Sequence, residues 1–297
     1  MKKIAALVLA FISFGFIYAL PVGNPTEASL FLNGAWCEST ACDPCDPCFS
    51  WCDAWSFRIG FYGDYVFNRH LEVKHHNEDN DAGDDIQTTT LFTNAGYLVL
   101  NFCDRLDIFA TLGSTHLHIR TDDLSWDPIS LLIPQSQSEL DFVSNFSWSI
   151  GARATLLQCG CFGVGIEGQY FGFNPKLNYF LDYDDGNFTY LDEAKRTHYR
   201  EWQVGLGAAY RFATSCPTIA LIPYMAVKWA GCHLDMNDFV FVDELDDTVY
   251  TLNDLRSKKL WGYALGLTFT LCDMAGVTVE GRWGDEKALY VNGQFRF

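Results

Sequence analysis

The chain alternates between large apolar residues and polar or small residues over long stretches. In segment 57–67, for example, Phe57 and Ile59 are separated by Arg58, and the pattern continues in both directions. A period of two residues is typical of a β-strand with one apolar face. The pattern recurs along the chain, and it predicts ten strands: 55–68, 88–102, 105–119, 142–157, 162–173, 197–213, 217–230, 257–272, 276–283 and 287–297.

Most of these segments have ten or more residues, whereas strands of soluble sandwiches average about 5–6. A strand that crosses a bilayer at a tilt needs about 9–11 residues and must pair its backbone within a closed barrel. Short turns alternate with long connections, as they do between the periplasmic and outer sides of bacterial barrels. We therefore predict an all-β, antiparallel, transmembrane barrel of the bacterial outer membrane. It has ten to fourteen strands, because region 27–36 and the long connections leave room for two to four more.

The last strand ends in phenylalanine and alternates to its end. The sequence KALYVNGQFRF places four apolar residues on one face, with a departure from the pattern at Gly293. A final strand of this kind resembles the signal by which outer-membrane barrels are recognised for assembly. We assign that signal to Leu289, Val291, Phe295 and Phe297.

The first residues are typical of a secretory signal peptide. Lys2 and Lys3 precede an apolar stretch over 4–17, and Ala19 is small enough to precede a cleavage site. We expect a signal peptide over 1–19, a cysteine-rich periplasmic segment over 20–54, and the barrel over 55–297. The exported chain would begin near Leu20.

Four of the eleven cysteines form the run CDPCDPCFSWCD, at the spacing with which bacterial ferredoxins bind an iron–sulfur cluster. Asp53 follows the run where ferredoxins have proline, and a chain exported unfolded does not carry an assembled cluster. Zinc binding is permitted by the spacing. An exported protein meets an oxidising space, however, and there disulfide formation is the favoured fate of Cys42, Cys45, Cys48 and Cys52.

The 297 residues have a formal net charge of −17 and 16% aromatic residues. This acidity argues against binding nucleic acid. The polar faces of the strands carry six cations and four acids, which we predict to line the pore: Arg58, Asp64, Asp107, Arg153, Glu167, Arg211, Lys228, Glu280, Arg282 and Arg296. The G-x-G pairs Gly163/Gly165 and Gly205/Gly207 lie within strands and are predicted to leave room on the inner wall.

No catalytic or metal-binding motif accompanies the strands. His116 and His118 share one strand face, but no third and fourth ligand has a diagnostic spacing. His198, Asp182 and Asp184 fall near the expected upper rim, where some ten-stranded barrels carry a hydrolytic site, yet no nucleophile motif is present. We expect no cofactor, no metal and no enzyme, and we keep a hydrolase as the remaining enzymatic alternative.

Several long motifs resemble the chlamydial major outer membrane protein family, whose members are porins. They are ALPVGNPTEASLFLNG, DPCDPCFSWCDAWSFRIGFYGDYVFNRHLEV, WQVGLGAAYRF, PYMAVKW and VNGQFRF. The chain is somewhat short for the principal member, as a shorter member or a porin-like paralogue would be. The resemblance implies an outer-membrane channel for small hydrophilic solutes and cysteines that cross-link the envelope. The alternative is a structural or adhesive barrel without significant transport.

The same resemblance implies partners other than solutes and membrane lipid. These are cysteine-rich envelope proteins joined through disulfides, the host-cell surface, and further copies of the chain, with a trimer among the homo-oligomers considered. The predicted topology gathers ten cysteines on the periplasmic side and leaves Cys232 on the outer half. We assign cross-linking to Cys37, Cys42, Cys45, Cys48, Cys52, Cys103, Cys159, Cys161, Cys216 and Cys272.

Overall fold

The computed structural model describes residues 20–32, 54–74, 86–122, 137–184, 187–191, 195–213, 218–236, 240–243 and 248–297. Nearly all of them are in β-strands, and the one helix described is the short 3-10 helix η1 (Glu27–Ser29). Among the residues described, no helix is long and apolar enough to cross a membrane.

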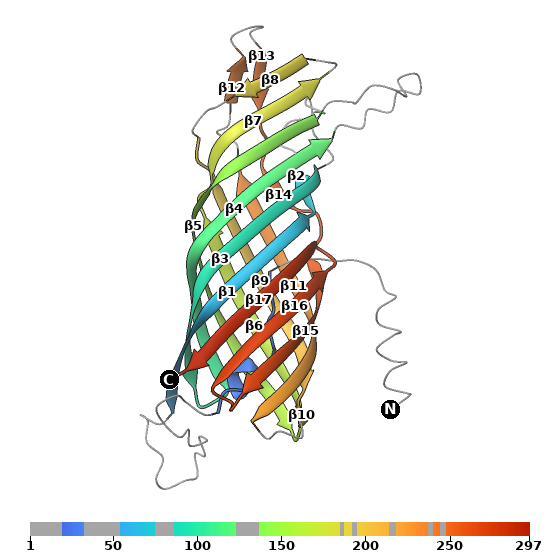
Figure 1. Cartoon of the computed structure of the whole chain (residues 1–297). Helices are drawn as coiled ribbons and strands as arrows, with labels where there is room; N and C mark the ends of the chain where they lie inside the picture. The colour runs from blue at the N-terminus through green and yellow to red at the C-terminus, as the bar shows by residue number, and fades with distance from the viewer. Residues whose placement is uncertain are drawn as a thin grey trace.

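Ten strands form a closed antiparallel barrel (Figure 1). They pair in the order β1-β3-β4-β5-β6-β9-β11-β15-β16-β17, and β17 pairs with β1 from Arg58↔Arg296 to Arg69↔Glu286. Their bounds are β1 (Trp55–Arg69), β3 (Ile86–Phe102), β4 (Leu106–Asp122), β5 (Gln137–Cys159), β6 (Phe162–Phe173), β9 (His198–Tyr210), β11 (Ile219–Asp235), β15 (Trp261–Leu271), β16 (Ala275–Trp283) and β17 (Glu286–Arg296). Each corresponds to one of the ten predicted strands, and the prediction of a ten-strand barrel is confirmed.

The remaining strands extend the barrel wall or pair outside it. They are β2 (Leu71–Val73), β7 (Lys176–Asp184), β8 (Asn187–Leu191), β10 (Phe212–Ala213), β12 (Val240–Asp243), β13 (Thr248–Thr251) and β14 (Leu255–Ser257). Most belong to the long connections at the upper end of Figure 1, and β10 lies at the lower end with the C-terminus. The connections described therefore add short strands and no further barrel strand.

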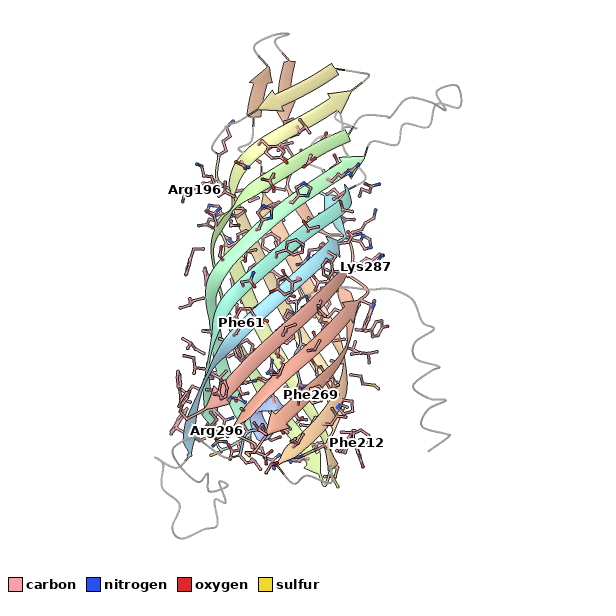
Figure 2. All side chains as sticks on the ribbon, viewed as in Figure 1. Phe61, Arg196, Phe212, Phe269, Lys287 and Arg296 are labelled. Atoms are coloured by element: carbon pink, nitrogen blue, oxygen red, sulfur yellow. The ribbon has the colours of Figure 1, made fainter. Side chains whose placement is uncertain are left out.

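The alternation seen in the sequence separates an apolar outer face from a polar interior. Large apolar side chains such as Phe61, Leu265 and Phe269 are exposed on the outer wall, and most of their neighbours along each strand are buried (Figure 2). Phe295 and Phe297 of the predicted assembly signal are exposed on this face as well. An outward apolar band is what a lipid bilayer requires of a membrane barrel.

Five tryptophans mark the upper part of this apolar face. Trp202 and Trp229 meet edge to face with ring centroids 4.8 Å apart, and Trp229 stacks near Trp261 at 6.3 Å. Trp148 on β5 and Trp283 on β16 point outward too. Tryptophan is enriched where a membrane meets water, so this belt marks one lipid boundary.

Two of the tight turns at the lower end have the same unusual backbone. Cys103 and Asp104 have φ of 53° and 52°, and Cys272 and Asp273 both have φ of 52°. Two consecutive residues with positive φ are the signature of the type I′ turn, whose twist matches that of a β-hairpin. Both turns therefore join long strands directly and hold a cysteine at the hairpin tip.

Candidate functional site

The barrel interior holds most of the predicted pore-lining charges. Nine of the ten are buried: Arg58, Asp64, Asp107, Arg153, Glu167, Lys228, Glu280, Arg282 and Arg296. The tenth, Arg211, lies at the lower end, where its Nη2 donates to Asp273 Oδ1 at 2.6 Å. That these side chains line a path for solutes stays a prediction.

The inner wall carries further charges that the sequence analysis missed. Arg69 donates to Glu201 through both Nη atoms, at 2.5 and 2.7 Å. A register shift between Val66 and Asn68 turns Arg69 inward, and strict alternation does not foresee such a bulge. The buried charges of the barrel strands are six cations (Arg58, Arg69, Arg153, Lys228, Arg282 and Arg296) and six acids (Asp64, Asp107, Glu167, Glu201, Glu280 and Glu286). Among the described residues, cations and acids on the wall strands are therefore equal in number, and Asp104, Asp254 and Asp285 are buried in turns and connections.

The most important feature that sequence patterning missed lies inside the barrel. Residues 20–31 are buried within it as an extended segment that leads into η1, seen in blue near the lower end of the barrel in Figure 1. We call residues 20–31 the plug. Its hydrogen bonds reach β9, β11 and β16 near Leu20 and β3 and β5 near Ser29.

Carboxylates of the wall accept hydrogen bonds from the backbone of the first plug residues. Glu280 accepts from the N–H of Val22 at 3.1 Å and from that of Gly23 at 2.8 Å. The N–H of Leu20 donates to Glu201 Oε1 at 3.3 Å, and Lys228 Nζ donates to the carbonyl of Leu20. Carboxylates of the wall are therefore matched to backbone donors of the plug.

Arg153 connects the lower half of the plug to the wall. Its Nη1 lies 2.7 Å from Glu27 Oε1 of the plug, and its Nε donates to Glu167 on β6 at 2.6 Å. Arg58 donates to the carbonyl of Glu27 at 3.2 Å and places its guanidinium 4.8 Å from the ring centre of Phe31. Two wall arginines thus hold η1 through charge, hydrogen bonds and cation–π contact.

Glycines on β6 and β9 make the space for the plug. A Cβ on Gly165 would lie 1.7 Å from the carbonyl oxygen of Pro25, and one on Gly163 would lie 2.5 Å from Thr26 Cγ2. On β9, a Cβ on Gly205 would lie 2.9 Å from Val22 Cγ1. The prediction that these G-x-G pairs leave room on the inner wall is confirmed, and the occupant is the chain's own N-terminal segment.

Above the charged layer, the interior is filled by apolar side chains. One buried cluster joins Leu20 of the plug to Phe142, Phe171 and Leu234 of the upper wall, together with other residues of the connections. An apolar constriction excludes water and ions unless it opens. The described interior is therefore occupied at two levels, by the plug and by the cluster.

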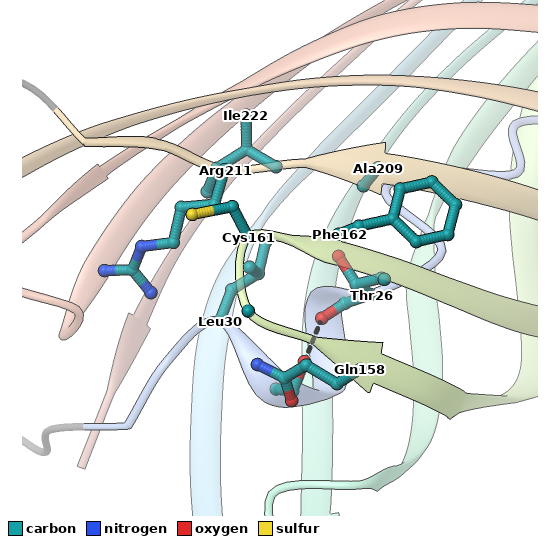
Figure 3. A pocket seen from close by; sticks show the side chains of 11 residues that line it. Thr26, Leu30, Gln158, Cys161, Phe162, Ala209, Arg211 and Ile222 are labelled. Carbon is teal, nitrogen blue, oxygen red and sulfur yellow. Dashed lines mark hydrogen bonds between the residues drawn. The ribbon is translucent and has the colours of Figure 1, made fainter.

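A small pocket opens where η1 meets the lower hairpin between β5 and β6 (Figure 3). Leu30, Gln158, Cys161 and Arg211 line it, and within it Ser29 Oγ donates to the carbonyl of Thr26 at 3.0 Å. At the neighbouring turn, burial raises the pKa of the Asp104 carboxyl, against the opposing charge of Arg296. Side chains of η1, the wall and the lower hairpin thus meet around this pocket.

The described cysteines occupy the positions expected of them. Cys103, Cys159, Cys161 and Cys272 lie at the lower hairpins, and Cys232 is buried on β11, where Ser257 Oγ donates to its sulfur at 3.1 Å. The other predicted cross-linking residues, Cys37, Cys42, Cys45, Cys48, Cys52 and Cys216, lie outside the described residues. Within the described part of the chain, no disulfide joins Cys103, Cys159, Cys161 or Cys232.

The ring nitrogens of the candidate histidines contact carboxylate or amide oxygens. His118 Nε2 is 2.8 Å from Glu139 Oε1, and His116 Nε2 is 3.2 Å from Asp141 Oδ1. His198 Nδ1 contacts the amide oxygen of Asn174 at 2.8 Å. The side chains of Asp182 and Asp184 lie outside the described part of the structure.

The chain is similar in sequence to one protein family along most of its length. The family model described as Chlamydia major outer membrane protein matches residues 1–83, 73–132, 127–190 and 235–297. Over the full length of both chains, the sequence is 31% identical to the major outer membrane porin of Chlamydia psittaci and to that of Chlamydia trachomatis serovar C. The outer membrane protease OmpT of Escherichia coli aligns over 82% of this chain and 95% of its own, with 11% identity and a TM-score of 0.41.

We predict that Gly165→Ala displaces the plug while the barrel still forms. The new Cβ has no room beside Pro25, so the backbone amides of residues 20–31 should exchange with deuterium at least about tenfold faster in the folded protein. Hydrogen exchange with mass spectrometry measures this. Gly168→Ala on the same strand is the control, because its Cβ would meet nothing closer than 3.8 Å. Equal protection in both variants would show that Gly165 does not make space for the plug.

Proposed function

Because the chain belongs to the chlamydial major outer membrane protein family, we propose that it is an outer-membrane porin for small hydrophilic solutes, held closed by its own N-terminal segment. The closed barrel and the membership of the family support the porin function. The plug and the apolar cluster support closure by the N-terminal segment, because both lie inside the barrel. Solute passage then requires the plug to leave its place and the cluster to open.

A tether between the plug and the wall tests whether the plug must move. The ideal Cβ of Gly163 lies 3.4 Å from Thr26 Cβ, close to the separation of about 3.5–4.5 Å found in disulfides. We expect the oxidised Thr26→Cys/Gly163→Cys protein to admit sugars into liposomes at least about tenfold more slowly than the same protein after reduction.

Three controls accompany this tether, because the chain has eleven cysteines of its own. They are the unsubstituted protein and the two single variants, each measured oxidised and reduced. If the tethered protein passes sugars as fast as its reduced form, the path does not depend on the plug. If no form passes sugars, the porin proposal itself fails.

The alternative of a structural or adhesive barrel is favoured by one observation, the filled interior. Cross-linking through the lower hairpins would serve either role, and we propose that it occurs through the ten cysteines named above. Replacing Cys42, Cys45, Cys48 and Cys52 with serine should remove high-mass species from non-reducing gels of native membranes and leave the barrel folded. Unchanged high-mass species would contradict this assignment.

We also propose that cleavage after Ala19 leaves Leu20 as the first residue of the mature chain. Its amino group would then lie against Glu201, as the Leu20 N–H does in the structure. The expected intact mass corresponds to residues 20–297, and an amine-reactive reagent should label this amino group only after unfolding. The exposed Lys287 serves as the internal control, since it should react in the folded protein. Rapid labelling of Leu20 in the native state would place the mature N-terminus outside the barrel.

A hydrolase is the less favoured function. The relatives named above are porins, and His198 is paired with an amide rather than with a carboxylate. We propose that the chain has no catalytic activity of its own.

A further inference from the structure

Two side-chain amides on the inner face of β17 have no hydrogen-bond partner. Asn292 and Gln294 are 0% and 1% exposed, and neither the oxygen nor the nitrogen of either amide meets a partner among the described residues. The other four amides buried in the described part of the chain all form hydrogen bonds: Asn24, Asn101, Gln169 and Gln203. Burying an amide without a hydrogen bond is unfavourable, so this pair keeps a capacity for hydrogen bonding that the wall itself does not use.

Gln294 lies beside the last residue of the plug. β1 and β16 flank β17 (Figure 1), and in their register Gly60 and Gly276, which have no side chains, stand on either side of Gln294. A Cβ on Gly276 would lie 2.7 Å from Phe31 Cζ, and the centre of the Phe31 ring is 4.8 Å from the guanidinium carbon of Arg58 on β1. The ring of Phe31 therefore crosses the inner face of β17 near Gln294 and covers this part of the wall with an apolar surface.

Asn292 lies among tyrosine rings. Tyr62 on β1 is its register partner, Tyr290 precedes it by two residues on the same strand face, and both tyrosines are buried. The two rings meet edge to face with their centroids 5.4 Å apart. On the other side of Asn292, the hydroxyl of Thr278 is already engaged with that of Thr268 at 2.8 Å. Aromatic surface beside a few polar groups is typical of a site for a small molecule.

Two ion pairs border this stretch of the wall. Arg58 donates to Asp107, and Arg296, two residues from Gln294, donates to Asp104 at 2.7 Å. A charged solute gains no free counter-charge from these two described pairs. The unpaired amides, in contrast, offer donors and acceptors without net charge. They match hydroxyl groups, because each hydroxyl also donates and accepts.

From these observations we propose that Asn292 and Gln294 form a binding subsite for uncharged sugars on the solute path of the open barrel. The proposal rests on the porin function proposed above, because the plug covers the subsite until it leaves. The two amides hydrogen-bond to sugar hydroxyls, and the rings of Tyr62 and Tyr290 pack against the C–H face of the sugar. A sugar bound here occupies the emptied wall, so it also favours the open state over the plugged one.

Sugar influx into liposomes tests the subsite in the full-length protein. Asn292→Leu/Gln294→Met replaces both amides with apolar groups of similar shape. Each lost hydrogen bond weakens binding about two- to tenfold, so the glucose concentration that half-saturates influx should rise at least about tenfold, and glycine influx should change less than about twofold. Heat-modifiable migration on gels verifies that each variant forms the barrel.

The matched control is Thr93→Val/Thr111→Val, which removes two buried hydroxyls from the inner face of β3 and β4. These hydroxyls are already paired, with Thr115 at 2.8 Å and with Ser149 at 2.7 Å. The control should keep the half-saturating glucose concentration within about twofold of that of the unsubstituted protein.

Hydrogen exchange of the plug supplies a readout that does not depend on flux. Glucose at about 0.5 M should accelerate exchange of the amides of residues 20–31 at least about threefold in the unsubstituted protein, and not in Asn292→Leu/Gln294→Met. Equal half-saturation in the amide and control variants, or equal acceleration with and without the amides, would overturn the subsite and leave the porin function standing. If neither glucose nor glycine enters the liposomes, the porin function is wrong and the subsite falls with it.

Discussion

A charge that a strand places on the inner face of a narrow, closed barrel must find its partner inside that barrel. Burying an ion without a partner costs several kcal/mol, and a closed wall leaves few routes for water to supply one. The wall meets part of this requirement itself, through pairs such as Arg69 with Glu201 and Arg153 with Glu167. The plug meets another part, because it offers backbone donors to Glu280 and a carboxylate to Arg153.

Because of this requirement, the wall and the plug match each other in shape as well as in charge. Glycine at positions 163, 165, 205 and 207 would be a weakness in strands that faced an open channel, since glycine costs conformational entropy and packs nothing. Here atoms of Thr26, Pro25 and Val22 occupy the space beside Gly163, Gly165 and Gly205, whereas Gly207 lies against both Pro25 and the neighbouring strand β11. The glycines at positions 163, 165 and 205 are thus explained by contact with the plug.

How far the sequence predicted the molecule depends on where a residue's partner lies. Period-two alternation located all ten barrel strands, because the apolar and polar faces of a strand are visible in its own sequence. It failed at Arg69, where a bulge changes the phase, and it could not show that Leu20 to Phe31 fill the interior. Nothing within that segment predicts its place, because its contacts with the wall are with residues 31 to 258 positions away, for example Arg58 and Glu280. The glycine pairs were the one local signal that something had to fit against the wall.

Displacing the plug costs the free energy of its contacts with the wall. A hydrogen bond to a charged group contributes about 1.5–3 kcal/mol net of its replacement by water. The two bonds to Glu280 would contribute about 3–6 kcal/mol by this measure, from which the cost of ordering the plug must be subtracted. Opening the apolar cluster around Leu20 costs additional free energy. In a porin that works as proposed above, these contacts break before solutes pass, and an interaction that binds the displaced plug or the emptied wall favours opening.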